Sequence, residues 1–168
     1  METIVTASVQ RKAVTAMLKA HPYEEVAYDL YPMDLKGRGF GLGRVGKLPA
    51  AMTLRELTEH AKAVFDVPTV RVVGDLARPI RKVAVLGGSG GRYMRHAMFA
   101  GADVLVTGDI DYHTAHDALA AGLALLDVGH NVEKVMKRGV ADYLAAQLAK
   151  TDTQVVASAI NTEPFQFV

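Results

Sequence analysis

Hydrophobic and polar positions alternate at the start of the chain and then recur at helical spacing. Residues 3–9 alternate and are rich in β-branched side chains, which is typical of a strand. Residues 11–20 place apolar side chains three and four positions apart, which predicts a helix that ends before Pro22. Residues 26–31 again have the composition of a strand. The pattern therefore predicts a β-α-β start.

The next 40 residues continue this series with two more strands and one helix. A third strand is predicted at 41–47 and a fourth at 69–73. Between them Thr53 and Glu56 have the spacing of a capping box, which predicts the start of a helix. The resulting β-α-β-β-α-β order over residues 1–75 is that of a ferredoxin-like domain, an antiparallel sheet with two helices on one face.

A different pattern follows a short linker at residues 75–79. Short apolar strands now alternate with longer helical segments. Alternation of this kind calls for parallel strands that are buried on both faces. We therefore expect an α/β protein with a second domain at residues 79–168. The predicted elements of that domain are strand 82–86, helix 93–100, strand 103–106, helix 112–121, strand 123–127, helix 132–149 and strand 154–158.

Composition is that of a packed globular protein and argues against several kinds of partner. Half of the 168 residues are hydrophobic and 22% are charged. The 19 basic and 18 acidic side chains leave a net charge of +1, so a nucleic-acid partner is not expected. No run reaches the roughly 18 apolar residues that would span a membrane, and the absence of cysteine suits a reducing compartment. We expect a cytoplasmic protein.

Polar side chains follow the predicted parallel strands of the second half. Ligands of such sheets bind beyond the carboxyl ends of the strands, and those ends share one edge. The sequence therefore predicts a polar rim. Its candidate residues are Ser89, Thr107, Asp109, Asp127 and His130.

The first of these strands runs into a turn made almost entirely of glycine. A turn without side chains lets backbone N–H groups approach an anion, and it is equally well explained as a tight turn that needs positive φ angles. Neither a P-loop nor the dinucleotide fingerprint is present, so nucleotide binding by those motifs is not supported. The candidate anion-binding residues are Gly87, Gly88, Ser89, Gly90 and Gly91.

The second strand is followed by a segment unusually rich in ionisable side chains. Residues 107–117 hold two histidines, three aspartates and a tyrosine. On a helix that begins near Asp111, His113 and Asp117 would share a face and could bind a metal or act as an acid–base pair. The alternative is that Asp109 or Asp111 caps the helix and the imidazoles only form hydrogen bonds.

The third strand leads to a histidine and a glutamate three residues apart. His130 leaves the strand and Glu133 lies in the first helical turn, so the two side chains can share a divalent ion such as Zn, Fe or Mn. Alternatively, Asn131 caps the helix and Glu133 interacts with its dipole.

Several sequence motifs, in order along nearly the whole chain, resemble the Nif-three-like dinuclear metal-centre family. Many members of that family are labelled GTP cyclohydrolase I type 2 homologues. The runs that carry the resemblance are HPYEEVAYDLYPM, GFGLGRVGKL, KVAVLGGSGG, TGDIDYHTAHDA, DVGHNVEKVMKRGV and NTEPFQFV.

The resemblance implies properties that the spacing of residues does not. Family members form hexameric rings or cages with two metal ions per subunit. Longer members carry an inserted domain similar to the PII and CutA proteins, and residues 1–75 resemble that insert. Residues 79–168 then resemble the C-terminal half of the interrupted metal-binding domain, so we expect a fragment or short form that lacks the N-terminal half.

That half supplies two histidines and an aspartate to the metals of family members. Only His130 and Glu133 carry over as ligands here, with Asp109 and His113 near the metals, so this chain is expected to bind metal weakly or not at all. Two functions stay open. One is a metal-dependent hydrolase acting on nucleotides, and the other is a non-enzymatic metal-binding scaffold or regulatory ring with a PII-like sensor domain.

Overall fold

The computed structural model describes residues 2–35 and 39–167 and divides the chain into two units. One unit spans Met1–Gly39 and the other Phe40–Val168. In the first unit, helix α1 (Gln10–Ala20) forms where the apolar spacing predicts it, but none of its residues is buried.

The strands predicted at residues 3–9 and 26–31 do not form, so the ferredoxin-like arrangement is not confirmed. A strand forms only where its backbone N–H and C=O groups find a partner strand. Among the described residues of this unit no such pairing exists. The alternating pattern alone therefore did not determine the structure of these segments.

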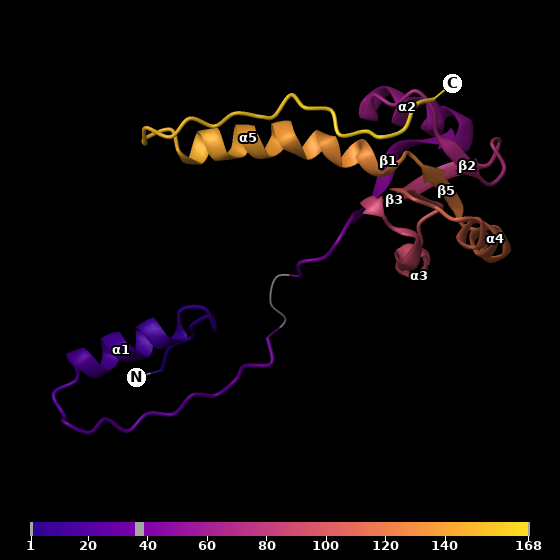
Figure 1. Cartoon of the computed structure of the whole chain (residues 1–168). Helices are drawn as coiled ribbons and strands as arrows, with labels where there is room; N and C mark the ends of the chain where they lie inside the picture. The colour runs from indigo at the N-terminus through magenta and orange to yellow at the C-terminus, as the bar shows by residue number, and fades with distance from the viewer. Residues whose placement is uncertain (1, 36–38, 168) are drawn as a thin grey trace. The chain divides into compact units, whose positions relative to one another are not determined.

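The second unit is built on one five-stranded sheet. Its strands are β1 (Arg44–Thr53), β2 (Arg71–Val73), β3 (Pro79–Ser89), β4 (Val104–Gly108) and β5 (Ala124–Asp127), in the spatial order β1-β3-β4-β5-β2. The three central strands are parallel, and the edge strands β1 and β2 pair antiparallel with β3 and β5. Figure 1 shows this sheet with its helices.

The edge strands belong to the same sheet as the central ones, which differs from the predicted arrangement. Strands were expected near both places, but β1 pairs with β3 and β2 pairs with β5. Residues 75–79, expected to be a linker between domains, connect two strands of this sheet. The chain therefore divides at residue 39 in this structure. Alternation predicts which face of a strand is buried, whereas the choice of partner strand has no local signal.

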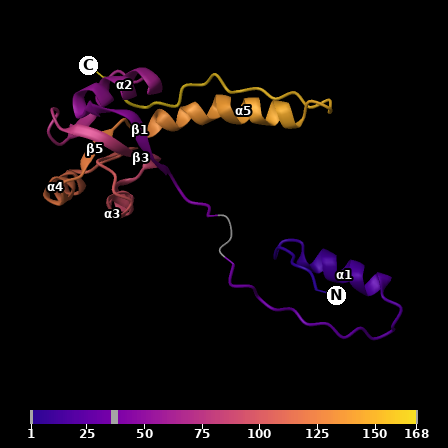
Figure 2. The same cartoon turned by 180° about the vertical axis from the view of Figure 1, so that it is seen from behind.

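Helices cover both faces of the sheet, as Figures 1 and 2 show. Helix α2 (Leu54–Phe65) packs on one face with Val104 and Val106 of β4. Helices α3 (Met94–Phe99) and α4 (Tyr112–Ala121) pack on the other face with Leu105. All residues of β4 and β5 are buried, as expected for parallel strands between two layers of helices.

The capping signals of two helices are confirmed. Glu56 N–H donates to the hydroxyl of Thr53, and the Glu56 carboxylate accepts from the backbone N–H of Thr53 at 2.7 Å. Asp111 caps α4 by accepting from Thr114 N–H at 2.9 Å.

The chain continues through short helical turns and a helix at the surface. A 3-10 turn (η1, Gly91–Tyr93) precedes α3, and another (η2, His130–Val135) precedes α5 (Met136–Gln147), which has no buried residue. The strand predicted at 154–158 does not form. Within residues 2–35 and 39–167 no helix is long and apolar enough to cross a membrane.

Candidate metal centre

The turns that follow β4 and β5 lie in direct backbone contact. A Cβ atom on Gly108 would lie 2.7 Å from the carbonyl carbon of Gly129, so this approach requires glycine. Because β4 and β5 are parallel, both turns leave the same edge of the sheet. Asp109 and His130 are thereby brought together from 21 residues apart, as the predicted rim requires.

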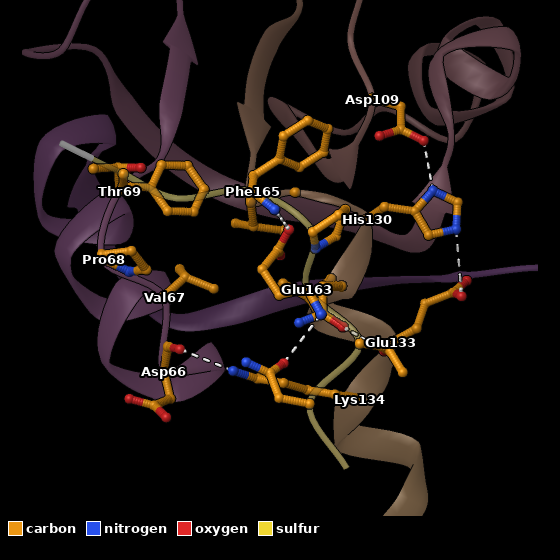
Figure 3. A pocket seen from close by; sticks show the side chains of 18 of the residues that line it. Asp66, Val67, Pro68, Thr69, Asp109, His130, Glu133, Lys134, Glu163 and Phe165 are labelled. Carbon is orange, nitrogen blue, oxygen red and sulfur yellow. Dashed lines mark hydrogen bonds and ion pairs between the residues drawn. The ribbon is translucent and has the colours of Figure 1, made fainter.

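His130 lies between two carboxylates, as Figure 3 shows. Its Nδ1 is 2.5 Å from Oδ2 of Asp109, and its Nε2 is 3.6 Å from Oε2 of Glu133. All three side chains are about half exposed. A hydrogen bond to an ionised carboxylate requires the proton on Nδ1, so the neutral ring presents an Nε2 lone pair towards Glu133.

The charge around the imidazole favours its protonated form. The hydrogen bond to Asp109 raises the pKa of His130, and the negative charges of Asp109 and, to a smaller extent, Glu133 act in the same direction against partial desolvation.

Glu133 lies over the glycine turn that ends β3. The carboxylate Oε1 is 2.6 Å from the place where a Cβ on Gly88 would stand. Gly88 also has a φ of +63°. Beside it, a Cβ on Gly90 would collide with the Thr107 hydroxyl, which donates to the Gly88 carbonyl at 3.0 Å. The turn thus makes a close approach to a carboxylate, and its predicted anion-binding role stays a prediction.

Asp127 forms a buried network beneath the two turns. Its carboxylate accepts from the backbone N–H of Ile110 at 3.1 Å and of Gly129 at 3.0 Å, and it is paired with the guanidinium of Arg71. Arg71 also donates to the carbonyl of Ile110 at 2.8 Å. The sequence placed Asp127 on the rim without a role. It gave no signal for Arg71, which comes from the distant strand β2.

Asp111 and His113, the remaining candidates of the segment after β4, contact other residues of α4. His113 is exposed on α4, where its ring meets Tyr112 edge-on with centroids 5.8 Å apart. Within the described residues it makes no hydrogen bond or ion pair with the three clustered side chains. The capping alternative holds for Asp111, whose pKa is lowered by its hydrogen bonds to the Thr114 hydroxyl and N–H.

The cluster borders a pocket of about 1250 Å³ in the second unit. The loop at residues 66–69, the turn η2 and residues 160–167 line this pocket. Lys134 donates to the carbonyl of Asp66 at 3.0 Å across it. Figure 3 shows His130 and Glu133 on one side and Val67 and Pro68 on the other, with Phe165 between them.

The donor set fits part of a metal site. Two ligands about 2.1 Å from one tetrahedral ion lie roughly 3.4 Å apart, close to the 3.6 Å between His130 Nε2 and Glu133 Oε2. A carboxylate on the other ring nitrogen is the usual arrangement for a metal-binding histidine. Among the described residues no group of three or more His, Cys, Asp or Glu side chains is arranged to hold an ion.

Known proteins similar to this chain share its sequence over nearly all its length. A family model described as Duf34/NIF3 (NGG1p interacting factor 3) matches residues 5–164. A protein of Halalkalibacterium halodurans named GTP cyclohydrolase 1 type 2 homolog is 57% identical over 170 residues, which cover 100% of this chain and 46% of that protein. A protein of Bacillus subtilis with the same name is 46% identical over the same shares.

Solved structures give the same result. A Bacillus cereus protein described as related to NIF3 matches with a TM-score of 0.90 and 54% identity, over 98% of this chain and 46% of that one. A Staphylococcus aureus protein matches with a TM-score of 0.86 and 36% identity, over 100% of this chain and 55% of that one. The chain spans about half the length of these relatives.

Proposed function

This chain belongs to the Duf34/NIF3 family, and we propose that His130 and Glu133 contribute two ligands to a divalent metal centre of such a protein. The observation that carries the proposal is the position of the imidazole. One ring nitrogen is held by Asp109 while the other faces the Glu133 carboxylate at 3.6 Å. An imidazole and a carboxylate suit Zn, Fe or Mn.

Each residue of the cluster has a distinct role in this proposal. Asp109 binds no ion but orients the His130 ring and keeps the proton on Nδ1. Gly88 leaves the space that the Glu133 carboxylate occupies. When bound, a pair of divalent ions would supply an activated water at neutral pH.

Two ligands are too few for a tight site. Protein sites for Zn generally use three or four protein ligands. We therefore propose that this chain alone binds at most one ion weakly, and that a part of the relatives' length outside the match completes a two-metal site. His113, predicted near the metals, is not proposed as a ligand, because among the described residues it makes no hydrogen bond or ion pair with the cluster.

Calorimetric titration of the chain with Mn or Zn tests the proposal. We expect weak binding of at most one ion, reversed by chelator and abolished by His130→Ala. His116→Ala is the matched control, because His116 is an exposed histidine of α4 whose ring, among the described residues, contacts the ring of Tyr112 and no other. Two tightly held ions in this chain, or unchanged binding by His130→Ala, would place the ligands elsewhere.

The name of the relatives leads to a second step of the proposal. A metal-dependent hydrolase acting on nucleotides would use the proposed centre to activate water, with the pocket beside His130 as the place for substrate. A protein extended to the relatives' full length, loaded with metal and incubated with GTP, separates this from a metal-binding scaffold or a hexameric regulatory ring. Turnover that His130→Ala abolishes supports the hydrolase, and absence of turnover supports the scaffold.

A further inference from the structure

The buried carboxylate of Asp127 bonds to both turns whose side chains meet at the candidate centre. Oδ2 accepts from the N–H of Ile110, directly after Asp109, and Oδ1 accepts from the N–H of Gly129, directly before His130. One side chain, 5% exposed, thus ties together the two backbone segments that present the Asp109–His130 pair.

The turn after β4 needs such support. Asp109 has a φ of +55°, and for a residue with a side chain this left-handed conformation is unfavourable. Asp127 holds the N–H of Ile110 and Arg71 holds its carbonyl, so both polar backbone groups of the residue after Asp109 are fixed. The turn is thereby held in the conformation that directs the Asp109 carboxylate to Nδ1 of His130.

We propose that Asp127, paired with Arg71, is a positioning residue that keeps neutral His130 in the Nδ1–H tautomer, with Nε2 free to bind a cation. The inference rests on the proposed metal-binding role of His130 for its functional meaning. The tautomer itself is a property of the metal-free chain. A neutral histidine in water favours the Nε2–H form, so the Nδ1–H form reports that the hydrogen bond to Asp109 is intact.

The test is the pair of imidazole ¹⁵N shifts of His130 in the metal-free chain, at a pH where the ring is neutral. In the wild type, we expect a protonated Nδ1 and an unprotonated Nε2. Asp109→Ala removes the acceptor, so its two ¹⁵N shifts should approach those of the Nε2–H form, which is the opposite limit. Asp127→Asn cannot accept from both N–H groups at once, because one of its two side-chain atoms is now a donor. We expect it to move both shifts towards that limit.

Asp103→Asn is the matched control. The Asp103 carboxylate also accepts from two backbone N–H groups, those of Arg81 and Lys82, both at 2.8 Å. It does so at the opposite end of the parallel strands, where β4 begins. Oδ2 alone accepts both hydrogen bonds, so the amide oxygen of Asn can replace it. Asp103→Asn thus controls for the loss of a carboxylate charge on a residue that binds two backbone N–H groups, and it should leave the His130 tautomer unchanged.

The His130 shifts of the two variants decide the proposal. A shift in Asp127→Asn without one in Asp103→Asn supports the proposal. No shift in either variant, or equal shifts in both, overturns it. If Asp127→Asn does not fold, Arg71→Gln takes its place, because it removes the partner of Asp127 and the bond to Ile110 from an exposed side chain. It is expected to move the shifts in the same direction, and an unchanged tautomer would overturn the proposal.

Metal affinity gives a second readout of the same variants. Loss of a group that supports a ligand costs about 10- to 100-fold in affinity, and we expect that loss for Asp127→Asn. Two tightly held ions in the wild-type chain, or binding that His130→Ala leaves unchanged, would contradict the proposed metal-binding function. The tautomer result would still decide the role of Asp127, so the two failures can be distinguished.

Discussion

The centre of the sheet and helix α1 have equally clear sequence patterns but opposite burial. Every residue of β4 and β5 is buried, whereas no residue of α1 is. Leu125 is fully enclosed between the two helical layers, and Leu18, on the apolar side of α1, is 42% exposed. A periodic pattern thus predicts the local conformation. Whether an apolar face is buried depends on whether other parts of the same chain pack against that face.

The largest expected effect on stability comes from a pair of leucine truncations that tests this comparison. Leu125→Ala removes a fully buried side chain and should lower the free energy of unfolding by about 2–5 kcal/mol. Leu18→Ala should change it by less than about 0.5 kcal/mol, as at other exposed positions. Urea unfolding followed by circular dichroism measures both. An equal loss for Leu18→Ala would show that α1 is packed in solution and would break the comparison.

The same contrast explains which elements could be predicted. Helix α1, the capped start of α2, the three parallel strands and α4 form close to where periodicity and caps place them. These are decided by residues within a few positions of one another. The segments at 3–9, 26–31 and 154–158 were also predicted as strands, yet they form none. A strand forms only beside a partner strand that is often distant in the sequence, and the residues of one strand do not determine which partner that is.

The candidate site divides in the same way. Asp109 and His130 were expected together because parallel strands end at one edge, and their hydrogen bond has that origin. Asp127 accepts hydrogen bonds from both turns and pairs with Arg71, and these contacts join residues up to 56 positions apart. The space that Gly88 leaves for the Glu133 carboxylate likewise depends on two turns that lie side by side. Such contacts follow from the sheet order, which the sequence did not predict.

A pair of glycine substitutions sharpens the comparison inside the second unit. Gly88 and Gly122 both have positive φ, +63° and +72°, so alanine at either should cost about 1–2 kcal/mol of stability. At Gly88 the new Cβ meets the Glu133 carboxylate, whereas at Gly122 none of the described residues beyond its neighbours comes within 4 Å of it. We expect similar losses of stability, measured in urea, but a loss of Mn or Zn binding in Gly88→Ala alone. Unchanged binding by Gly88→Ala would show that this glycine does not define the position of Glu133.

The smallest expected effect concerns the N-terminal caps of helices α1 and α2. Helix α1 is preceded by Val9, whose side chain forms no capping hydrogen bond, whereas α2 begins with the Thr53–Glu56 capping box. The hydrogen bond from the Thr53 backbone N–H, followed by that from its hydroxyl, lowers the pKa of Glu56 from its ordinary value of 4.5. A folded-state pKa below the unfolded one gives stability that is present above pH 4.5 and is lost as the pH falls through the folded value.

Glu56→Gln keeps the hydrogen-bonding shape of the box but removes this charge. We expect it to be slightly less stable than the wild type at pH 7, and the difference to vanish as the pH falls well below 4.5, where Glu56 is protonated. Urea unfolding across this pH range measures it. Glu24→Gln is the control, because Glu24 is exposed and makes no hydrogen bond or ion pair with the described residues. If the Glu56→Gln difference persisted at low pH, its origin would be packing and not charge, since both side chains are then neutral and the N-terminal charge interaction is absent from each.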